Sequence, residues 1–236
     1  LFLNNYLIIN ESSNLVNCFN NFCSEYCENN FKEIKENKDS CIVTEKIINV
    51  YEHIKKIIST CFDNNKVISM QFDNIYRKQL NLIYKDNTIL CNCINKYLDS
   101  IIKDSIKNNI DIDTHEKYKP LFNIINYVND TDYLLNYYKY YLTKRLLNTQ
   151  YNLDSEDIIS HTFQVIFGND FTSKIVSMLN DMKTSEKLND EYRYTLTGSS
   201  IDKKKFNTKI ITSAMWSADK FDKLEYPIDL SNHINN

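Results

Sequence analysis

The scarcity of glycine and proline most constrains how this chain can fold: its 236 residues contain two of each. β-Sandwiches and barrels need many tight turns, and tight turns depend on these two residues. We therefore expect long helices joined by turns of asparagine, aspartate and serine. The same scarcity excludes Walker loops, Rossmann turns and G-x-S-x-G elbows, because Gly168 and Gly198 stand alone and far apart.

Apolar residues recur every three or four positions over most of the chain, which is the period of an amphipathic helix. One such face holds Ile47, Ile48, Tyr51, Ile54, Ile58 and Phe62. Similar faces follow within residues 68–83, 89–106 and 121–128. Further helices are expected from Thr131 as an N-cap, from Asp154 to a stop at Gly168, and onward from Phe171. The pattern predicts a mainly α protein.

The C-terminal part has a different texture. Residues Phe206–Trp216, FNTKIITSAMW, are rich in β-branched and aromatic side chains, which predicts a strand. Leu224–Leu230 is a second candidate extended segment, confined to an edge or a connection by Pro227. One or two strands are not stable alone. The strand is therefore expected to pair with residues beyond Asn236 or with another chain.

Charge and cysteine content argue against several classes of function. The net charge is −3, and the one dense basic run is Lys203–Lys205, which is too short for the basic face of a nucleic-acid binder. No apolar run approaches the ~20 residues of a membrane span, and residues 1–10 lack the basic start of a signal peptide. Seven cysteines and four histidines lack the paired spacing of a zinc site. We expect no metal, no cofactor, reduced thiols and no catalytic constellation.

Residues Thr131–Gln150, TDYLLNYYKYYLTKRLLNTQ, combine five tyrosines with a basic pair and a leucine pair. Positive charge in a last helical turn favours the helix dipole by ~0.3–1 kcal/mol. That accounts for Lys144 and Arg145 but not for the whole string.

The string resembles the cullin family signature, an acidic turn followed by YYK-x-x-L-x-K-R-L-L. The matching residues are Asp132, Tyr137, Tyr138, Lys139, Leu142, Lys144, Arg145, Leu146 and Leu147. Thr143 departs from the family, which usually has a small residue such as alanine there.

Three further strings resemble the family in the same order. Phe171, Thr172, Ser173 and Lys174, followed by Met178, Asp181 and Met182, are similar to F-T-S-K-x-x-x-M-x-x-D-M, and Ser185, Lys187–Asn189 and Tyr192 fit the family's next segment. Lys96–Lys103 is similar to K-Y-x-D-S-L-L-K. Phe206–Trp216 resembles the strand that opens the family's α/β region.

The resemblance implies an elongated helical repeat followed by a helical bundle and the first strands of a small α/β region. The expected divisions are the end of the repeats at 1–94, a four-helix-bundle-like region at 95–197, and an incomplete α/β region at 198–236. Leu1–Asn236 would be a central slice, without the adaptor-binding first repeat and without the winged helix that carries the modified lysine. Tyr138, Leu142, Leu146 and Phe171 are expected in the bundle core, with Arg145 paired to an acidic group.

The function implied is that of a scaffold subunit of a cullin-RING ubiquitin ligase, without catalytic residues of its own. Its implied partners are a RING-box protein, a ubiquitin-conjugating enzyme held indirectly, and a substrate adaptor through the missing N-terminal region, with no nucleic acid and no membrane. The implied location is the cytoplasm, the nucleus or both. A strand of the RING-box protein would pair with the strand that contains Phe206, Thr208, Ile210, Thr212 and Trp216.

Two alternatives remain. A helical-repeat tethering protein unrelated to ubiquitin transfer would show the same amphipathic helices, but it does not predict the KRLL and FTSK strings at these spacings. An enzyme with an unrecognised site is the other.

Overall fold

The computed structural model describes residues 12–35, 37, 39–84, 86–148, 151–195 and 207–216. Within them the chain is almost entirely helical and has no β-strand. The helices are α2 (Ser12–Ile34), α3 (Ser40–Phe62), α4 (Lys66–Leu80), α5 (Asn87–Asn108), the 3-10 turn η1 (Ile112–Thr114), α6 (Tyr118–Ile125), α7 (Thr131–Leu147), α8 (Leu153–Phe167) and α9 (Asn169–Thr195). The expectation of a mainly α protein is confirmed.

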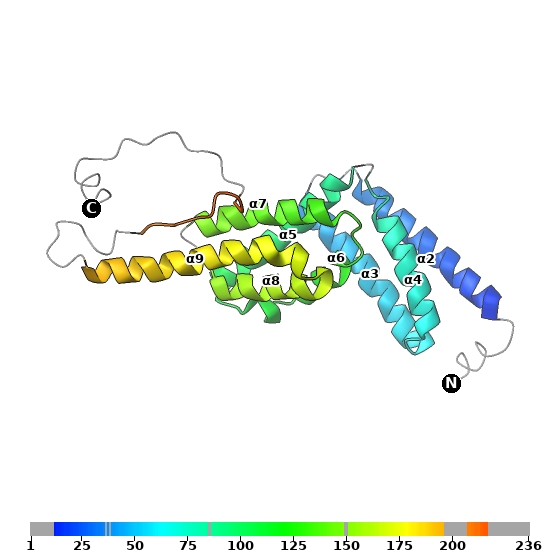
Figure 1. Ribbon diagram of the computed structural model, residues 1–236. Coiled ribbons are helices and arrows are strands. Elements are labelled where there is room, and N and C mark those ends of the chain that lie inside the picture. Colours follow the sequence, from blue (N-terminus) through cyan, green and yellow to red (C-terminus); the bar gives the residue numbers. More distant parts are fainter. Residues whose placement is uncertain are drawn as a thin grey trace.

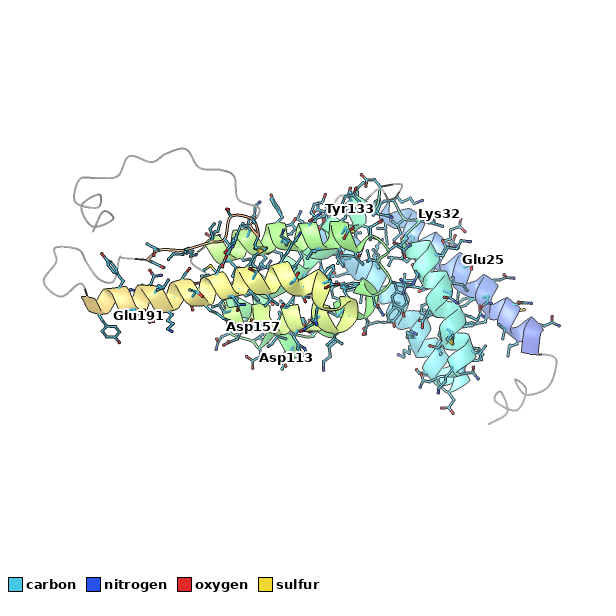
Figure 2. The ribbon with its side chains drawn as sticks, viewed as in Figure 1. Glu25, Lys32, Asp113, Tyr133, Asp157 and Glu191 are labelled. Carbon is cyan, nitrogen blue, oxygen red and sulfur yellow. The ribbon has the colours of Figure 1, made fainter. Side chains whose placement is uncertain are left out.

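The helices form an elongated body (Figure 1). At one end α2, α3 and α4 pack against one another, and α3 continues the packing to α5 and α6. At the other end α5 packs on α7, and α9 packs on α7 and α8. One continuous apolar core joins both ends, and charged side chains such as Glu25, Lys32 and Glu191 project from the outer faces (Figure 2).

Asparagine and aspartate provide the helix ends that glycine would otherwise provide. The side chains of Asp39, Asn65, Asp86 and Asn152 accept backbone N–H bonds in the first turns of α3, α4, α5 and α8. Asp63 and Asn109 end α3 and α5 in the left-handed conformation, at φ of 48° and 53°. Short polar side chains tolerate this conformation better than other non-glycine residues.

Gly168 is the one described helix end that uses glycine, and it ends α8 at φ 88° as the sequence predicts. The predicted N-cap of α7 is wrong by one residue. Thr131 is the first helical residue and Asp130 precedes it as N-cap, without a side-chain cap bond because its carboxylate takes the amide of Asn87.

The predicted divisions stay a prediction. The boundary between residues 94 and 95 falls inside α5, which packs on α3 on one side and on α7 on the other. Residues 207–216 are not helical and no strand is assigned within them, so the strand predicted over Phe206–Trp216 stays a prediction. Phe206 and Leu224–Leu230 lie outside the described residues.

Candidate scaffold junctions

The signature helix α7 buries one apolar stripe in the bundle. Leu134, Tyr138, Leu142 and Leu146 are at most 1% exposed, as expected for core residues. Apart from Arg145, the other signature residues of this helix are not buried: Tyr137 and Lys139 are half-buried, and Asp132, Lys144 and Leu147 are exposed. The leucines of the string are therefore not equivalent, because only the first of the pair packs inward.

Arg145 lies inside the bundle, 3% exposed, between two carboxylates from other helices. Its Nε donates to Oε1 of Glu156 at 2.6 Å and its Nη2 to Oε2 at 3.0 Å. Its Nη1 donates to Oδ1 of Asp99 at 2.8 Å. The expected pairing of Arg145 with an acidic group is confirmed, and it joins α5, α7 and α8 at one point.

The hydroxyl of Tyr138 donates to Oε2 of Glu156 at 2.9 Å, and Lys103 reaches Oδ2 of Asp99 at 2.6 Å. Burial alone lowers the pKa of the Arg145 guanidinium, but the carboxylate of Glu156 outweighs burial and the pKa is raised. Burial, together with the charge of Glu156, raises the pKa of the Tyr138 phenol. Arg145 is a buried cation paired with two carboxylates, not a solvated cation at the helix end.

The FTSK string forms the first turns of α9. Phe171 is half-buried against the rings of Phe163 and Phe167. The prediction that it lies within the bundle core is therefore wrong, because it packs at the edge of the core. Thr172 is buried, while Ser173 and Lys174 are exposed. Burial and the neighbouring charge of Lys174 lower the pKa of Lys139, and α7 and α9, which carry the two signature strings, pack on one another.

Residues 207–216 run along α9 (Figure 1). Asn189, Ser185 and Asp181, four residues apart on the helix, bind alternate residues of the segment. The Thr208 N–H donates to Oδ1 of Asn189 at 2.9 Å, and the Asn189 amide donates to the Thr208 carbonyl at 2.7 Å.

The same two-bond pattern repeats at Ile210, and the third contact, at Thr212, uses the backbone N–H alone. The Ile210 N–H donates to Oγ of Ser185 at 2.8 Å, and the Ser185 hydroxyl faces the Ile210 carbonyl at 3.1 Å. The Thr212 N–H and the Trp216 indole donate to Oδ2 of Asp181 at 2.7 and 2.8 Å. Trp216 is 6% exposed.

Lys209 connects this segment to the end of α7. Its Nζ donates to the carbonyls of Leu146 and Asn148 at 2.5 and 2.9 Å, and burial lowers its pKa. The positive charge that bonds the last carbonyls of the signature helix therefore comes from Lys209, which is 63 positions away from Leu146. Lys144 and Arg145 lie in the last turn of α7, as the sequence predicts, but neither bonds the terminal carbonyls, since Arg145 is buried between carboxylates and Lys144 donates to the Tyr140 hydroxyl.

The partners Asp99 and Glu156 and the three polar residues of α9 were not singled out as contact residues. The spacing of Asp181, Ser185 and Asn189 marks one helix face and is visible in the sequence, whereas the partners of Arg145 lie 46 and 11 residues away and depend on the fold. Among the described residues no group of three or more metal-ligating side chains converges. Nor does any described helix have the length and apolar content to cross a membrane.

Packed helices around one continuous core, joined by buried polar contacts, define a mainly helical body of the α-solenoid class. A family model described as the cullin alpha solenoid domain matches residues 4–189. The chain belongs to the cullin family.

Individual relatives agree with this membership. The chain is 26% identical to Cullin-1 of Schizosaccharomyces pombe over 177 residues, which is 73% of this chain and 23% of the relative. It is 27% identical to Cullin-3A of Arabidopsis thaliana over 153 residues, 64% of this chain and 20% of the relative. It is 26% identical to Cullin-3 of S. pombe over 195 residues, 80% of this chain and 22% of the relative. The matched regions therefore cover about a fifth of the length of these relatives.

Proposed function

We propose that this chain is part of the scaffold of a cullin-RING ubiquitin ligase and contributes no catalytic residue. Such a scaffold accelerates transfer by holding the charged conjugating enzyme near its target, which is catalysis by proximity. Family membership carries the proposal. The buried Asp99–Arg145–Glu156 tie supports it, because a part that fixes the distance between partners must resist bending.

The RING-box protein is the proposed direct partner. Its strand would pair with the segment that contains Phe206, Thr208, Ile210, Thr212 and Trp216, by backbone hydrogen bonds between chains. The extended course of residues 207–212 beside α9 supports this. The conjugating enzyme would be held through the RING-box protein, and no residue of this chain is proposed to bind a substrate adaptor. The proposed location is the cytoplasm, the nucleus or both.

Co-expression of Leu1–Asn236 with a tagged RING-box protein tests the proposal. We expect the two chains to purify together, and the complex to speed ubiquitin discharge from a charged conjugating enzyme more than the RING-box protein alone. Replacing residues 207–216 by a Gly-Ser linker should abolish capture. The control replaces Val67 and Met70 by serine, because both are exposed on α4, far from the segment in sequence. Equal capture by the two variants, or none by the unmodified chain, would argue for a tethering protein instead.

A further inference from the structure

The contacts between α9 and residues 208–212 have matching periods. Two residues of extended chain advance by about 6.7 Å, and four residues of α-helix by about 6.0 Å. Successive polar side chains on one helix face can therefore meet every second residue of a strand that runs beside it. The pairs formed by Thr208 with Asn189, Ile210 with Ser185 and Thr212 with Asp181 follow this rule, and they run antiparallel to the helix.

In the first two pairs, both the backbone N–H and the backbone C=O of Thr208 and of Ile210 bond the helix side chain. In an extended chain the N–H and the C=O of one residue point to the same edge, and those of the next residue to the opposite edge. The edge formed by Thr208, Ile210 and Thr212 is bonded to α9. None of the described residues hydrogen-bonds the backbone N–H or C=O of Lys209 or Ile211.

We propose that Asp181, Ser185 and Asn189 form a template on α9 that holds residues 207–212 as a strand and leaves the backbone edge of Lys209 and Ile211 to accept the strand of the RING-box protein. The inference rests on the proposed function for the identity of the partner, and on the contacts to α9 for the template. It assigns positioning roles to three helix side chains and fixes which backbone edge pairs.

An extended polypeptide is the occupant that this edge fits. The outward N–H and C=O groups of Lys209 and Ile211 alternate along the chain with the groups that are bonded to α9. The backbone of a second extended chain matches both the spacing and the hydrogen-bonding groups of this edge. Because α9 already fixes the backbone of these residues, a partner strand does not have to order them on binding. The side chain of Lys209 is held at the end of α7, which fixes the segment at a second point.

Backbone hydrogen exchange in the free chain tests the template without any partner. The amides of Thr208, Ile210 and Thr212 should exchange at least about tenfold more slowly than those of Lys209 and Ile211. Ser185→Ala should remove the protection of Ile210. Ser173→Ala is the matched control, because that hydroxyl lies on the same helix and is exposed, and it contacts only the carbonyl of Asp170.

Proline substitution tests the edge. Ile211→Pro removes one outward N–H while keeping the extended backbone and the template contacts. It should weaken capture of the RING-box protein by about tenfold or more, the size expected for a lost hydrogen bond in a strand pair. Ile211→Ala shortens the side chain but keeps the N–H, so it should bind more tightly than the proline variant. Both variants should keep the exchange pattern of the other template amides.

The outcomes separate the claims. Equal exchange of neighbouring amides, or protection unchanged by Ser185→Ala, would overturn the template. Capture that is equal in Ile211→Pro and Ile211→Ala, or no new protection of Lys209 and Ile211 in the complex, would overturn the edge assignment. An alternating pattern in a chain that captures no RING-box protein would instead overturn the proposed function and this partner, and would leave the template standing.

Discussion

The guanidinium of Arg145 is enclosed by carboxylates from two other helices, so the loss of one partner leaves a buried charge uncompensated. Arg145→Ala should cost ~3–5 kcal/mol of unfolding free energy. Arg145→Lys should recover only part of this, because a single ammonium cannot reproduce the fork that serves Glu156 and Asp99 together. Urea titration followed by circular dichroism measures both.

The control for this prediction is Lys32→Ala, which removes an exposed ion pair with Glu28 in a helix. Exposed pairs contribute ~0–1 kcal/mol. If Arg145→Ala were no more destabilising than Lys32→Ala, Arg145 would not be a buried tie.

Thr143 provides a prediction of the opposite sign. Its hydroxyl is buried and makes no hydrogen bond, at the position where the cullin signature usually has a small residue such as alanine. Thr143→Ala removes this unsatisfied group and improves helix propensity, so it should leave stability unchanged or raise it by about 1 kcal/mol.

Thr162→Ala is the matched control, because the same chemical change there breaks bonds to the Ile158 carbonyl and the Tyr118 hydroxyl. It should lower stability by about 1 kcal/mol. A Thr143→Ala chain that loses as much as Thr162→Ala would mean that the Thr143 hydroxyl has a partner.

At the scale of elements, periodicity predicts the helices well because each helix depends on its own neighbours in sequence. Gly168 and the stripe of Tyr138, Leu142 and Leu146 were predicted for this reason. The partners of Arg145 and the cap supplied by Lys209 could not be predicted from the sequence, because they depend on how distant helices pack. Pairing with the RING-box protein stays a prediction, but the backbone bonds of Thr208, Ile210 and Thr212 to α9 favour the edge of Lys209 and Ile211 over those three residues.

The carbonyls at the end of α7 depend on the ammonium of Lys209. Lys209→Met keeps most of the side-chain length and removes the charge, so it should cost about 1 kcal/mol through the lost cap and dipole interaction. Lys187→Met on α9 is the control, because Lys187 is exposed and far from that helix end in sequence. Thermal melts that shift equally for the two variants would contradict a capping role.

Asp181 accepts hydrogen bonds from Thr212 and from Trp216, the one tryptophan of the chain. Asp181→Ala should release the indole, so its fluorescence emission should shift to longer wavelength while far-ultraviolet circular dichroism stays unchanged. Asp190→Ala, an exposed carboxylate on the same helix, should not change the emission. An unshifted emission in Asp181→Ala would show that the apolar packing of Trp216 suffices.

At the scale of the whole molecule, the apolar core runs without interruption from α2 to α9, with α5 shared between the two ends. A shared helix couples the packing of one end to that of the other. The division predicted at residue 94 would then not be an independent folding boundary, whatever its role in the assembly.

Thiol reactivity measures this coupling. Cys18 and Cys61 are exposed, whereas Cys23 and Cys27 in α2 and Cys91 and Cys93 in α5 are buried. Burial raises the pKa of Cys23, Cys27 and Cys91 to about 12 and also raises that of Cys93. At mildly alkaline pH the two exposed thiols should therefore react first, because the thiolate is the nucleophile.

The raised pKa values also predict how stability depends on pH. Below the ordinary thiol pKa of 9.0 these cysteines are protonated in both the folded and the unfolded state, so they do not lower the free energy of unfolding. As pH rises from about 9 towards about 12, the unfolded state releases its thiol protons and the folded state retains them, so stability should fall. Cys27→Ala should make this alkaline loss shallower, as urea titrations at a series of pH values would measure.

The decisive experiment labels the thiols along a urea gradient and reads each cysteine by mass spectrometry. A single core predicts that the thiols of α2 and those of α5 become reactive at the same denaturant concentration, because neither helix can open without exposing the other's packing. Cys61 is the internal control, since it is exposed and should react throughout. If Cys23 and Cys27 opened well before Cys91 and Cys93, the α2 end would be a separate unit, and the rigidity required of a scaffold would have to come from α5 to α9 alone.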